Sequence, residues 1–129
     1  MGTRLYVHLT WTTLDRAPSI TAAVRDFLDR FLRQEAARHG ARPLAVGMVN
    51  DHVHLILELP PVYDLPRLVQ GLKGASARIA NRDGHAGPRP LQWTAGYDAR
   101  SVGVGGLDAA IRYVESQGVR HPDRAISRP

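Results

Sequence analysis

Hydrophobic and polar residues follow two different periods in the first half of the chain. In residues 4–13 ("RLYVHLTWTT") they alternate, which predicts a strand with one buried face. In residues 21–39 the apolar side chains recur at helical spacing on one stripe and stop at Gly40, which predicts an amphipathic helix. Residues 42–50 are typical of a second strand, and Asn50-Asp51 suits a tight hairpin turn into the apolar run that follows, residues 50–59.

The second half repeats this alternation of elements. Asp64 is a suitable N-cap for a helix that extends to about residue 82, and its apolar stripe holds Leu65, Leu68, Val69, Leu72 and Ile79. A loop rich in glycine and proline leads to a short strand near residues 99–104 and a last helix over residues 107–118. The order β-α-β-β-α-β-α predicts an α+β, ferredoxin-like fold. We expect a four-stranded antiparallel sheet with helices packed on one face, plus the C-terminal helix, in a single domain over residues 1–129.

Composition narrows the class of protein. With 43% apolar and 22% charged residues the chain resembles ordinary soluble domains, and no run of about 18 apolar residues predicts a membrane span. The first residues lack the apolar core of a signal peptide, so we expect a cytoplasmic protein. The absence of cysteine excludes disulfides, zinc-thiolate sites and cysteine nucleophiles. The net charge of +5 indicates a polyanionic partner such as nucleic acid.

Two histidines interrupt the strand "NDHVHLILEL". Because side chains of a strand alternate between its faces, His52 and His54 leave the sheet on the same side, while Val53 and Leu55 point to the other. The pair is typical of metal ligands, but two imidazoles do not fill a coordination sphere, so a third ligand must come from elsewhere. The alternative is a pair of surface or core-edge histidines on a half-exposed strand.

The last helix offers a candidate for that ligand in "AIRYVESQGVRH". Tyr113 and Gln117 are four residues apart and therefore share a helix face. A metal-dependent phosphoryl-transfer site could use the amide as a ligand and the phenol as the group that attacks phosphorus. A phenol has a pKa of about 10, so a neighbouring cation or base would have to help it lose its proton. Alternatively, Tyr113 fills an amphipathic surface and Gln117 is solvated.

The second helix carries a basic face opposite its leucine stripe. At about 100° per residue a narrow sector collects Arg67, Gly71, Gly74, Arg78 and Arg82. A solvated outer face explains the arginines but not the glycines, since each glycine costs roughly 1 kcal/mol relative to alanine in a helix interior. We expect a bare backbone flanked by guanidinium groups to let a sugar-phosphate strand approach. Lys73 projects to another side and reaches either a further phosphate or the active site.

Aromatic side chains precede the last predicted strand. Trp93 and Tyr97 lie in a predicted loop, where they either stack on unpaired bases or anchor the loop on the sheet. Trp11 is expected in the core. His8 lies on the other face of the first strand, and it supports the histidine site if that strand neighbours the histidine strand.

These segments together resemble a known family. "DHVHLIL", "LVQGLKGASARIAN", "LQWTAGY" and "AIRYVESQGVRH", in this order, look like the small single-tyrosine transposases of bacterial insertion sequences. Those enzymes belong to the His-hydrophobic-His superfamily of single-strand endonucleases, as do the REP-associated tyrosine transposases. The resemblance covers nearly the whole chain.

The resemblance implies a role for each matching residue. It assigns His52, His54 and Gln117 as ligands of a divalent metal, Mg²⁺ or Mn²⁺, and Tyr113 as the nucleophile that forms a 5′-phosphotyrosine link to single-stranded DNA. It implies single-stranded or hairpin DNA as partner. The DNA contacts are expected from the basic helix face and the aromatic loop described above, namely Arg67, Lys73, Arg78, Arg82 and Trp93. The resemblance also implies a homodimer in which the tyrosine helix of one protomer can complete the site of the other. Residues 103–106 ("GVGG") would be the hinge, or else a plain turn.

Other functions stay open at this stage. The chain could be a domesticated relative that cuts hairpin DNA without moving its own gene. It could also be a non-catalytic ferredoxin-like module that binds nucleic acid without a cation. A metal-dependent hydrolase of small phosphate esters is a third alternative, but the sequence offers it no evident general base.

Overall fold

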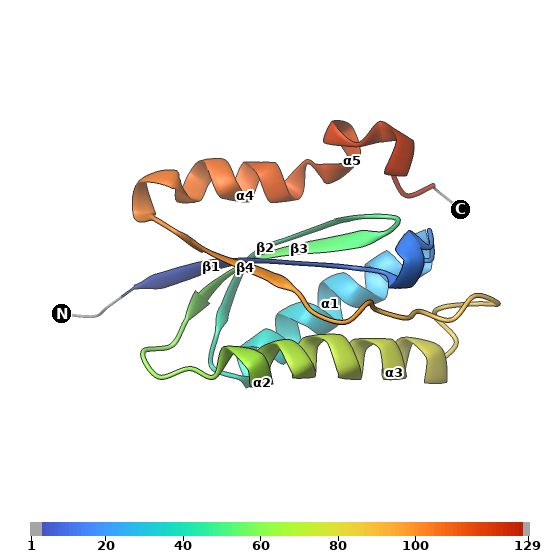
Figure 1. The fold of residues 1–129 in the computed structure, drawn as a ribbon, viewed down its shortest axis with the longest axis horizontal. Helices are drawn as coiled ribbons and strands as arrows, with labels where there is room; N and C mark the ends of the chain where they lie inside the picture. The colour runs from blue at the N-terminus through green and yellow to red at the C-terminus, as the bar shows by residue number, and fades with distance from the viewer. Residues whose placement is uncertain (1–3, 128–129) are drawn as a thin grey trace.

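Four antiparallel strands form one sheet with helices on both sides of it (Figure 1). The computed structural model describes residues 4–127. The strands are β1 (Leu5–Thr12), β2 (Arg42–Val49), β3 (His52–Leu59) and β4 (Asp98–Val102), in the spatial order β2-β3-β1-β4. The helices are α1 (Ala22–Arg38), α2 (Leu65–Gln70), α3 (Ser76–Arg82), α4 (Leu107–Glu115) and α5 (Gln117–Arg120). The predicted α+β, ferredoxin-like fold is confirmed.

The strand register divides the side chains between two faces. Leu9 lies opposite Leu55 and Trp11 opposite Val53, so these side chains of β1 and β3 share one face of the sheet. We call it the lower face, as it is drawn in Figure 1, and the opposite one the upper face. The lower face packs against α1, α2 and α3 and forms the main core, in which Leu9, Leu28 and Leu55 are fully buried. The period-two pattern therefore assigned this face correctly, and Trp11, at 2% exposure, is a core residue as predicted.

The second predicted helix is continuous but not α-helical throughout. Asp64 caps it as predicted, because its carboxylate accepts the backbone N–H of Arg67 at 3.1 Å. Residues Gly71–Ala75 between α2 and α3 wind as a π-helix, which adds a residue to the turn and rotates the later residues around the axis. A constant 100° step therefore does not describe this helix.

The predicted exposed position of Gly71 is wrong. A Cβ on Gly71 would lie 2.7 Å from Glu35 Oε2 and 2.9 Å from His39 Nε2, both on α1. Gly71 thus allows two helices to approach closely inside the lower layer. Gly74, in contrast, has open space around it, as predicted for the outer face. No helix in residues 4–127 is long and apolar enough to cross a lipid bilayer.

The upper face of the sheet carries a smaller layer made of α4 and α5 (Figure 1). Val114 of α4 packs on Ala45 of β2 and Ile56 of β3. A Cβ on Gly47 would overlap the carbonyl oxygen of Val114, so only glycine lets the helix lie this close to β2. The last helix, predicted to run unbroken to residue 118, instead breaks at Ser116, whose φ of −111° and ψ of 26° leave the helical region.

Candidate active site

The histidine pair lies on the upper face of the sheet, beneath the tyrosine helix. His54 is opposite Thr10 and His52 opposite Thr12, and the two imidazole centroids are 5.0 Å apart. Both side chains are buried, with 6% and 7% exposure. A hairpin of eight-residue strands thus fixes both rings by backbone register rather than by a flexible loop.

Each histidine uses its Nδ1 atom in a hydrogen bond. His52 Nδ1 lies 2.7 Å from Oδ1 of the buried carboxylate of Asp51, to which it donates. His54 Nδ1 lies 2.8 Å from His8 Nε2 and 3.1 Å from Thr10 Oγ1. These contacts leave Nε2 of both rings for another partner, and hydrogen bonds to Nδ1 commonly orient metal-binding histidines in this way.

Burial favours the neutral form of the His54 and His8 imidazoles. Desolvation, together with the neighbouring imidazoles of His52, His8 and His121, lowers the pKa of His54 to about 3. Desolvation also lowers the pKa of His8, although Asp98 acts in the opposite direction. A neutral imidazole has a lone pair available, so both the charge state and the orientation of His54 suit a metal ligand.

Tyr113 extends from α4 into the same site. Its ring is perpendicular to that of His54, with centroids 5.8 Å apart, and lies 6.2 Å from His8. The side chain is 37% exposed and lines a pocket of about 480 Å³. The other lining residues are His8, Thr10, His54, Asp98, Arg100 and Ala110. A phenol reachable from solvent therefore stands beside the histidines of its own chain.

Gln117 is the most deeply buried member of the predicted set. Its side chain is 1% exposed, and Nε2 donates to the carbonyl oxygen of Tyr113 at 2.9 Å. Its Oε1 is buried without a hydrogen-bond partner in the described part of the chain. A buried acceptor left unpaired costs free energy, so this oxygen suits a group that the protein binds, such as a cation.

By chemical type the donors suit a divalent cation, because the set has two imidazole nitrogens and one unpaired amide oxygen. Residues 4–127 contain no group of three or more His, Asp or Glu side chains that could hold a metal ion. Gln117, rather than a carboxylate, is therefore the candidate for the third protein ligand. The solvated interpretation of Gln117 is excluded by its burial.

The predicted DNA-contacting residues lie in the lower layer or its loops. Arg67 is on α2, and Arg78 and Arg82 are on α3, across the sheet from Tyr113 (Figure 1). Lys73 Nζ donates to the carbonyl oxygens of Thr94 and Gly96 at 2.7 and 2.6 Å. The structure brings none of these four residues to the histidine pocket.

Trp93 occupies the position of a loop anchor. Its Nε1 donates to Ser76 Oγ at 3.1 Å, and its ring meets that of Trp11 edge to face at 5.8 Å. Its indole thus packs against the main core. The contacts with DNA assigned to Trp93 and to the basic residues stay predictions.

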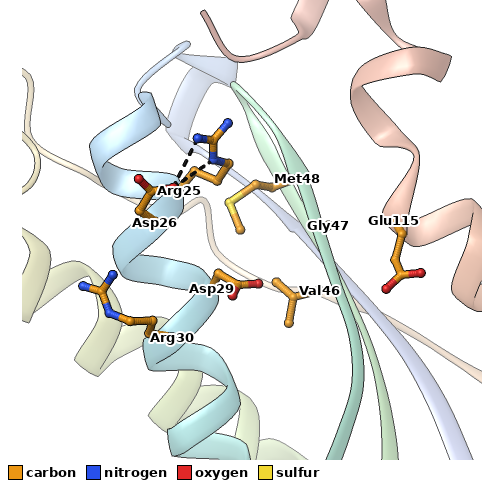
Figure 2. Close-up of a pocket in the computed structure, with 8 residues that line it drawn as sticks. All are labelled: Arg25, Asp26, Asp29, Arg30, Val46, Gly47, Met48 and Glu115. Atoms are coloured by element: carbon orange, nitrogen blue, oxygen red, sulfur yellow. Dashed lines mark hydrogen bonds and ion pairs between the residues drawn. The ribbon is translucent and has the colours of Figure 1, made fainter. Parts of the chain in front are cut away.

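A second pocket of similar size, about 490 Å³, lies between α1 and β2 and contains none of the predicted site residues (Figure 2). Arg25, Asp26, Asp29 and Arg30 line it from α1, and Glu115 faces it from α4. Asp26 pairs with Arg25 and Asp29 with Arg33, at 3.2 Å each. Both aspartates are paired with arginines on the same helix, and the histidine pocket remains the candidate active site.

Sequence reasoning gave little weight to several residues of this site. It considered His8 only as a support, yet His8 contacts His54 directly because β1 does neighbour β3. Asp51 entered the sequence analysis only as part of the hairpin turn, and its hydrogen bond with His52 follows from the geometry of that hairpin. The guanidinium carbon of Arg120 lies 4.8 Å from the ring centroid of Tyr113. Arg120 follows Tyr113 by seven residues, a spacing that would place both on one face of an unbroken helix, although the chain leaves the helical region at Ser116.

Comparison with known proteins identifies the family. A family model described as "Transposase IS200 like" matches residues 2–117, and the chain belongs to this family of single-tyrosine transposases. It is 39% identical over 75 residues to the ISDra2 transposase TnpA of Deinococcus radiodurans. That alignment covers 58% of this chain and 54% of the relative, so the chain matches about half of the relative's length.

Two solved structures share the fold. A crystal structure from Deinococcus radiodurans R1, described as that of a transposase, has 28% identity and a TM-score of 0.69, covering 98% of this chain and 95% of the other. A REP-associated tyrosine transposase bound to a REP hairpin has a TM-score of 0.71 at 13% identity, covering 91% and 68% of the two chains. The second likeness concerns the fold alone.

Proposed function

We propose that this protein cleaves and rejoins single-stranded DNA through a covalent bond between Tyr113 and a 5′-phosphate. The observation that carries the proposal is the position of the Tyr113 ring, 5.8 Å from that of His54 in a solvent-accessible pocket. Membership of the IS200-like transposases supports DNA transposition as the outcome. We expect the protein to act in the cytoplasm of a bacterium, where its DNA substrate is found.

In the proposed reaction the phenol oxygen of Tyr113 attacks the phosphorus of a phosphodiester. The bond from phosphorus to the 3′ oxygen breaks, that oxygen takes a proton to become a free 3′-hydroxyl, and the phenol loses its proton. The new phosphotyrosine bond retains the energy of the phosphodiester, so a 3′-hydroxyl can later attack it and restore a DNA strand without ATP. Tyr113 is then released unchanged.

The proposal includes a divalent ion, Mg²⁺ or Mn²⁺, held by His52, His54 and Gln117. When bound, it would draw negative charge from the phosphate oxygens and favour attack by the phenol. Ligation by His54 Nε2 requires the ring proton on Nδ1, where His8 and Thr10 can accept it. Asp51 similarly holds the proton of His52 on Nδ1.

The partners in this proposal are DNA and a second copy of the chain. The REP hairpin bound to the structural neighbour makes a hairpin a reasonable substrate here. Arg67, Arg78 and Arg82 would contact DNA outside the cleavage site, since they lie across the sheet from Tyr113. Exchange of the tyrosine helix in a dimer finds support in Gly103, Gly105 and Gly106. None of them has a left-handed φ or a close neighbour, so turn geometry does not explain them.

A denaturing gel tests the proposal. The protein is incubated with fluorescent single-stranded oligonucleotides, taken from the DNA that flanks its gene, in the presence of Mn²⁺. We expect a covalent protein–DNA band that disappears with EDTA, with Tyr113→Phe and with the double substitution His52→Ala/His54→Ala. Tyr113→Phe should still bind the oligonucleotide in a native gel.

Each other outcome points to a different function. Binding that needs no cation, with no adduct from any oligonucleotide, would indicate the non-catalytic module. Turnover with water and no trapped adduct would indicate a hydrolase. An adduct that survives Tyr113→Phe would overturn the choice of nucleophile. Adduct formation with hairpins, without joining of DNA ends, would indicate a domesticated endonuclease.

A further inference from the structure

Two arginines lie near Tyr113: Arg100 lines the same pocket, and Arg120 lies over the Tyr113 ring. In the strand register Arg100 of β4 lies opposite His8, which lies opposite Ile56 of β3. Directly paired residues share a face, so these three side chains form one row across the upper face. Helix α4 covers the part of this row over β2 and β3, and the β1 and β4 part stays open as the pocket floor.

Arg120 approaches the nucleophile from α5. Its guanidinium lies over the Tyr113 ring, 4.8 Å from the centroid, and its Nε donates to Ser116 Oγ at 2.9 Å. Among residues 4–127 it forms no ion pair with a carboxylate. Its charge is therefore balanced by no acidic side chain in the described part of the chain, and its terminal nitrogens can still donate.

Arg100 has a different environment. Its Nε donates to Asp98 Oδ2 at 2.9 Å, and its side chain is 77% exposed. Asp98 also lines the pocket, and its negative charge would repel an anion. Arg100 offsets this charge through its Nε. The two terminal nitrogens of Arg100 form no hydrogen bond with another side chain of the described residues. Arg120 then gives the surroundings of the Tyr113 ring a net positive charge.

The arginines expected from sequence to contact DNA are far from this position. Arg67, Arg78 and Arg82 lie in the layer on the other side of the sheet (Figure 1), and Arg82 pairs with Asp83 at 2.8 Å. A strand that presents a phosphate to Tyr113 must lie on the upper face. We propose that Arg100 and Arg120 form the binding site for the phosphodiester that Tyr113 attacks. This inference rests on the proposed function and names the residues that recognise its substrate.

Guanidinium groups suit this task. Their planar N–H groups match the oxygens of a phosphate and stay charged at every physiological pH. Two such groups near the phenol would hold the phosphate in place and neutralise its charge. Each phosphate contact to single-stranded DNA also releases counterions, with a contribution of about 0.7 to the slope of log affinity against log salt.

The test measures binding without chemistry. All variants carry Tyr113→Phe, EDTA is present, and the fluorescence anisotropy of a labelled single-stranded oligonucleotide is followed at several salt concentrations. We expect Arg100→Gln and Arg120→Gln each to weaken binding severalfold, and the double variant to lose about 1.4 from the salt slope. Arg120→Lys should keep most of the slope because it keeps the charge, even if it loses the planar fork.

Two further arginines complete the comparison. Arg30→Gln, on the exposed side of α1 (Figure 2), serves as a matched control for the loss of one charge and should change affinity less than twofold. Arg78→Gln probes the alternative face on α3. If Arg78→Gln weakens binding as much as the Arg100/Arg120 double variant, or if that double variant keeps the full salt slope, the inference is wrong.

The inference and the proposed function fail in different experiments. Absence of any adduct from the unmodified protein with Mn²⁺ contradicts the proposed function, whereas the anisotropy comparison still reports which arginines bind DNA. An adduct formed normally, together with unchanged affinity in the double variant, contradicts only the role of Arg100 and Arg120. Thermal unfolding of every variant identifies a loss that arises from misfolding, and Arg120→Lys then decides the point for Arg120.

Discussion

At the scale of single residues, the chemistry depends on which nitrogen atom each histidine leaves free. Asp51 is buried and accepts the Nδ1 proton of His52 at 2.7 Å, and its other oxygen lies 3.8 Å from Arg16 and 3.9 Å from Arg124. The carboxylate thus orients the ring and favours the tautomer that exposes Nε2.

Asp51→Asn should therefore weaken metal binding. An amide of the same shape fills the site but carries no charge, so we expect the affinity for Mn²⁺ to fall about 10- to 100-fold. Titration calorimetry with Mn²⁺ alone measures this, with no DNA present. The control is Asp26→Asn, which removes a surface carboxylate paired with Arg25. Equal affinity in both variants would exclude Asp51 as the group that positions His52.

Lys73 poses a second question at this scale, because its ammonium is already engaged. Burial lowers its pKa, and both carbonyl contacts hold the loop that carries Trp93. We expect Lys73→Met to lower the free energy of unfolding by about 1–3 kcal/mol, measured by urea denaturation. Single-stranded DNA affinity should change less than twofold. Lost affinity with unchanged stability would instead support the predicted contact with DNA.

At the scale of elements, the site is assembled by the docking of α4 on β2. The carbonyl oxygen of Val114 occupies the space where a side chain at position 47 would stand. Because this neighbour is backbone, it cannot move aside without moving the helix, and the helix carries Tyr113. The distance between the phenol and the histidines therefore depends on a glycine in a different element.

Gly47→Ala should displace α4 and stop DNA cleavage. We expect adduct formation to fall by at least 100-fold while the lower layer stays folded, since that layer packs on the opposite face. Gel assays measure the adduct, and hydrogen exchange of the α4 amides measures docking. Gly74→Ala makes the same chemical change where no atom lies within 4 Å, so it should leave both quantities unchanged. Full activity of Gly47→Ala would show that the site still forms when α4 docks at a different position on the sheet.

The elements also indicate how far the sequence could predict the fold. Alternation in β1 and β3 and the helical stripe in α1 are local patterns, and the structure follows them closely. The π-helix at Gly71–Ala75 and the break at Ser116 are not local in origin. The first lies against Glu35 and His39 of α1, and the second lies where the chain passes from α4 over β2 to α5.

The features of the site also divide into those that local sequence patterns predict and those that depend on contacts between distant elements. The shared face of His52 and His54 follows from strand geometry alone, and the structure has both rings on one face. The proximity of His8 and Arg100 required the strand order, which sequence suggested only through the fold class. The place of α4 on the upper face, rather than beside the other helices, depends on Gly47, and no periodicity marks such a contact.

At the scale of the whole molecule, the sheet separates two layers of unequal strength. The lower cluster joins residues of β1, β2 and β3 with α1, the helix from α2 to α3, and the loop at Leu91. The buried part of the upper cluster consists of Ala45, Ile56 and Val114. Since apolar burial dominates stability, we expect α4 and α5 to detach from the sheet in a local opening that leaves the rest of the domain folded.

Two substitutions distinguish this local opening from global unfolding. Val114→Ala should cost about 2 kcal/mol of docking energy, which lowers hydrogen-exchange protection of the α4 amides about thirtyfold and leaves α1 and β3 protected. Leu55→Ala removes a fully buried side chain from the lower cluster and should reduce global stability by about 2–5 kcal/mol, with lower protection throughout. Protection lost equally in α4, α1 and β3 after Val114→Ala would mean that the layers unfold together. Tyr113 could then leave the histidines only when the whole domain unfolds, which is incompatible with exchange of the tyrosine helix between folded protomers.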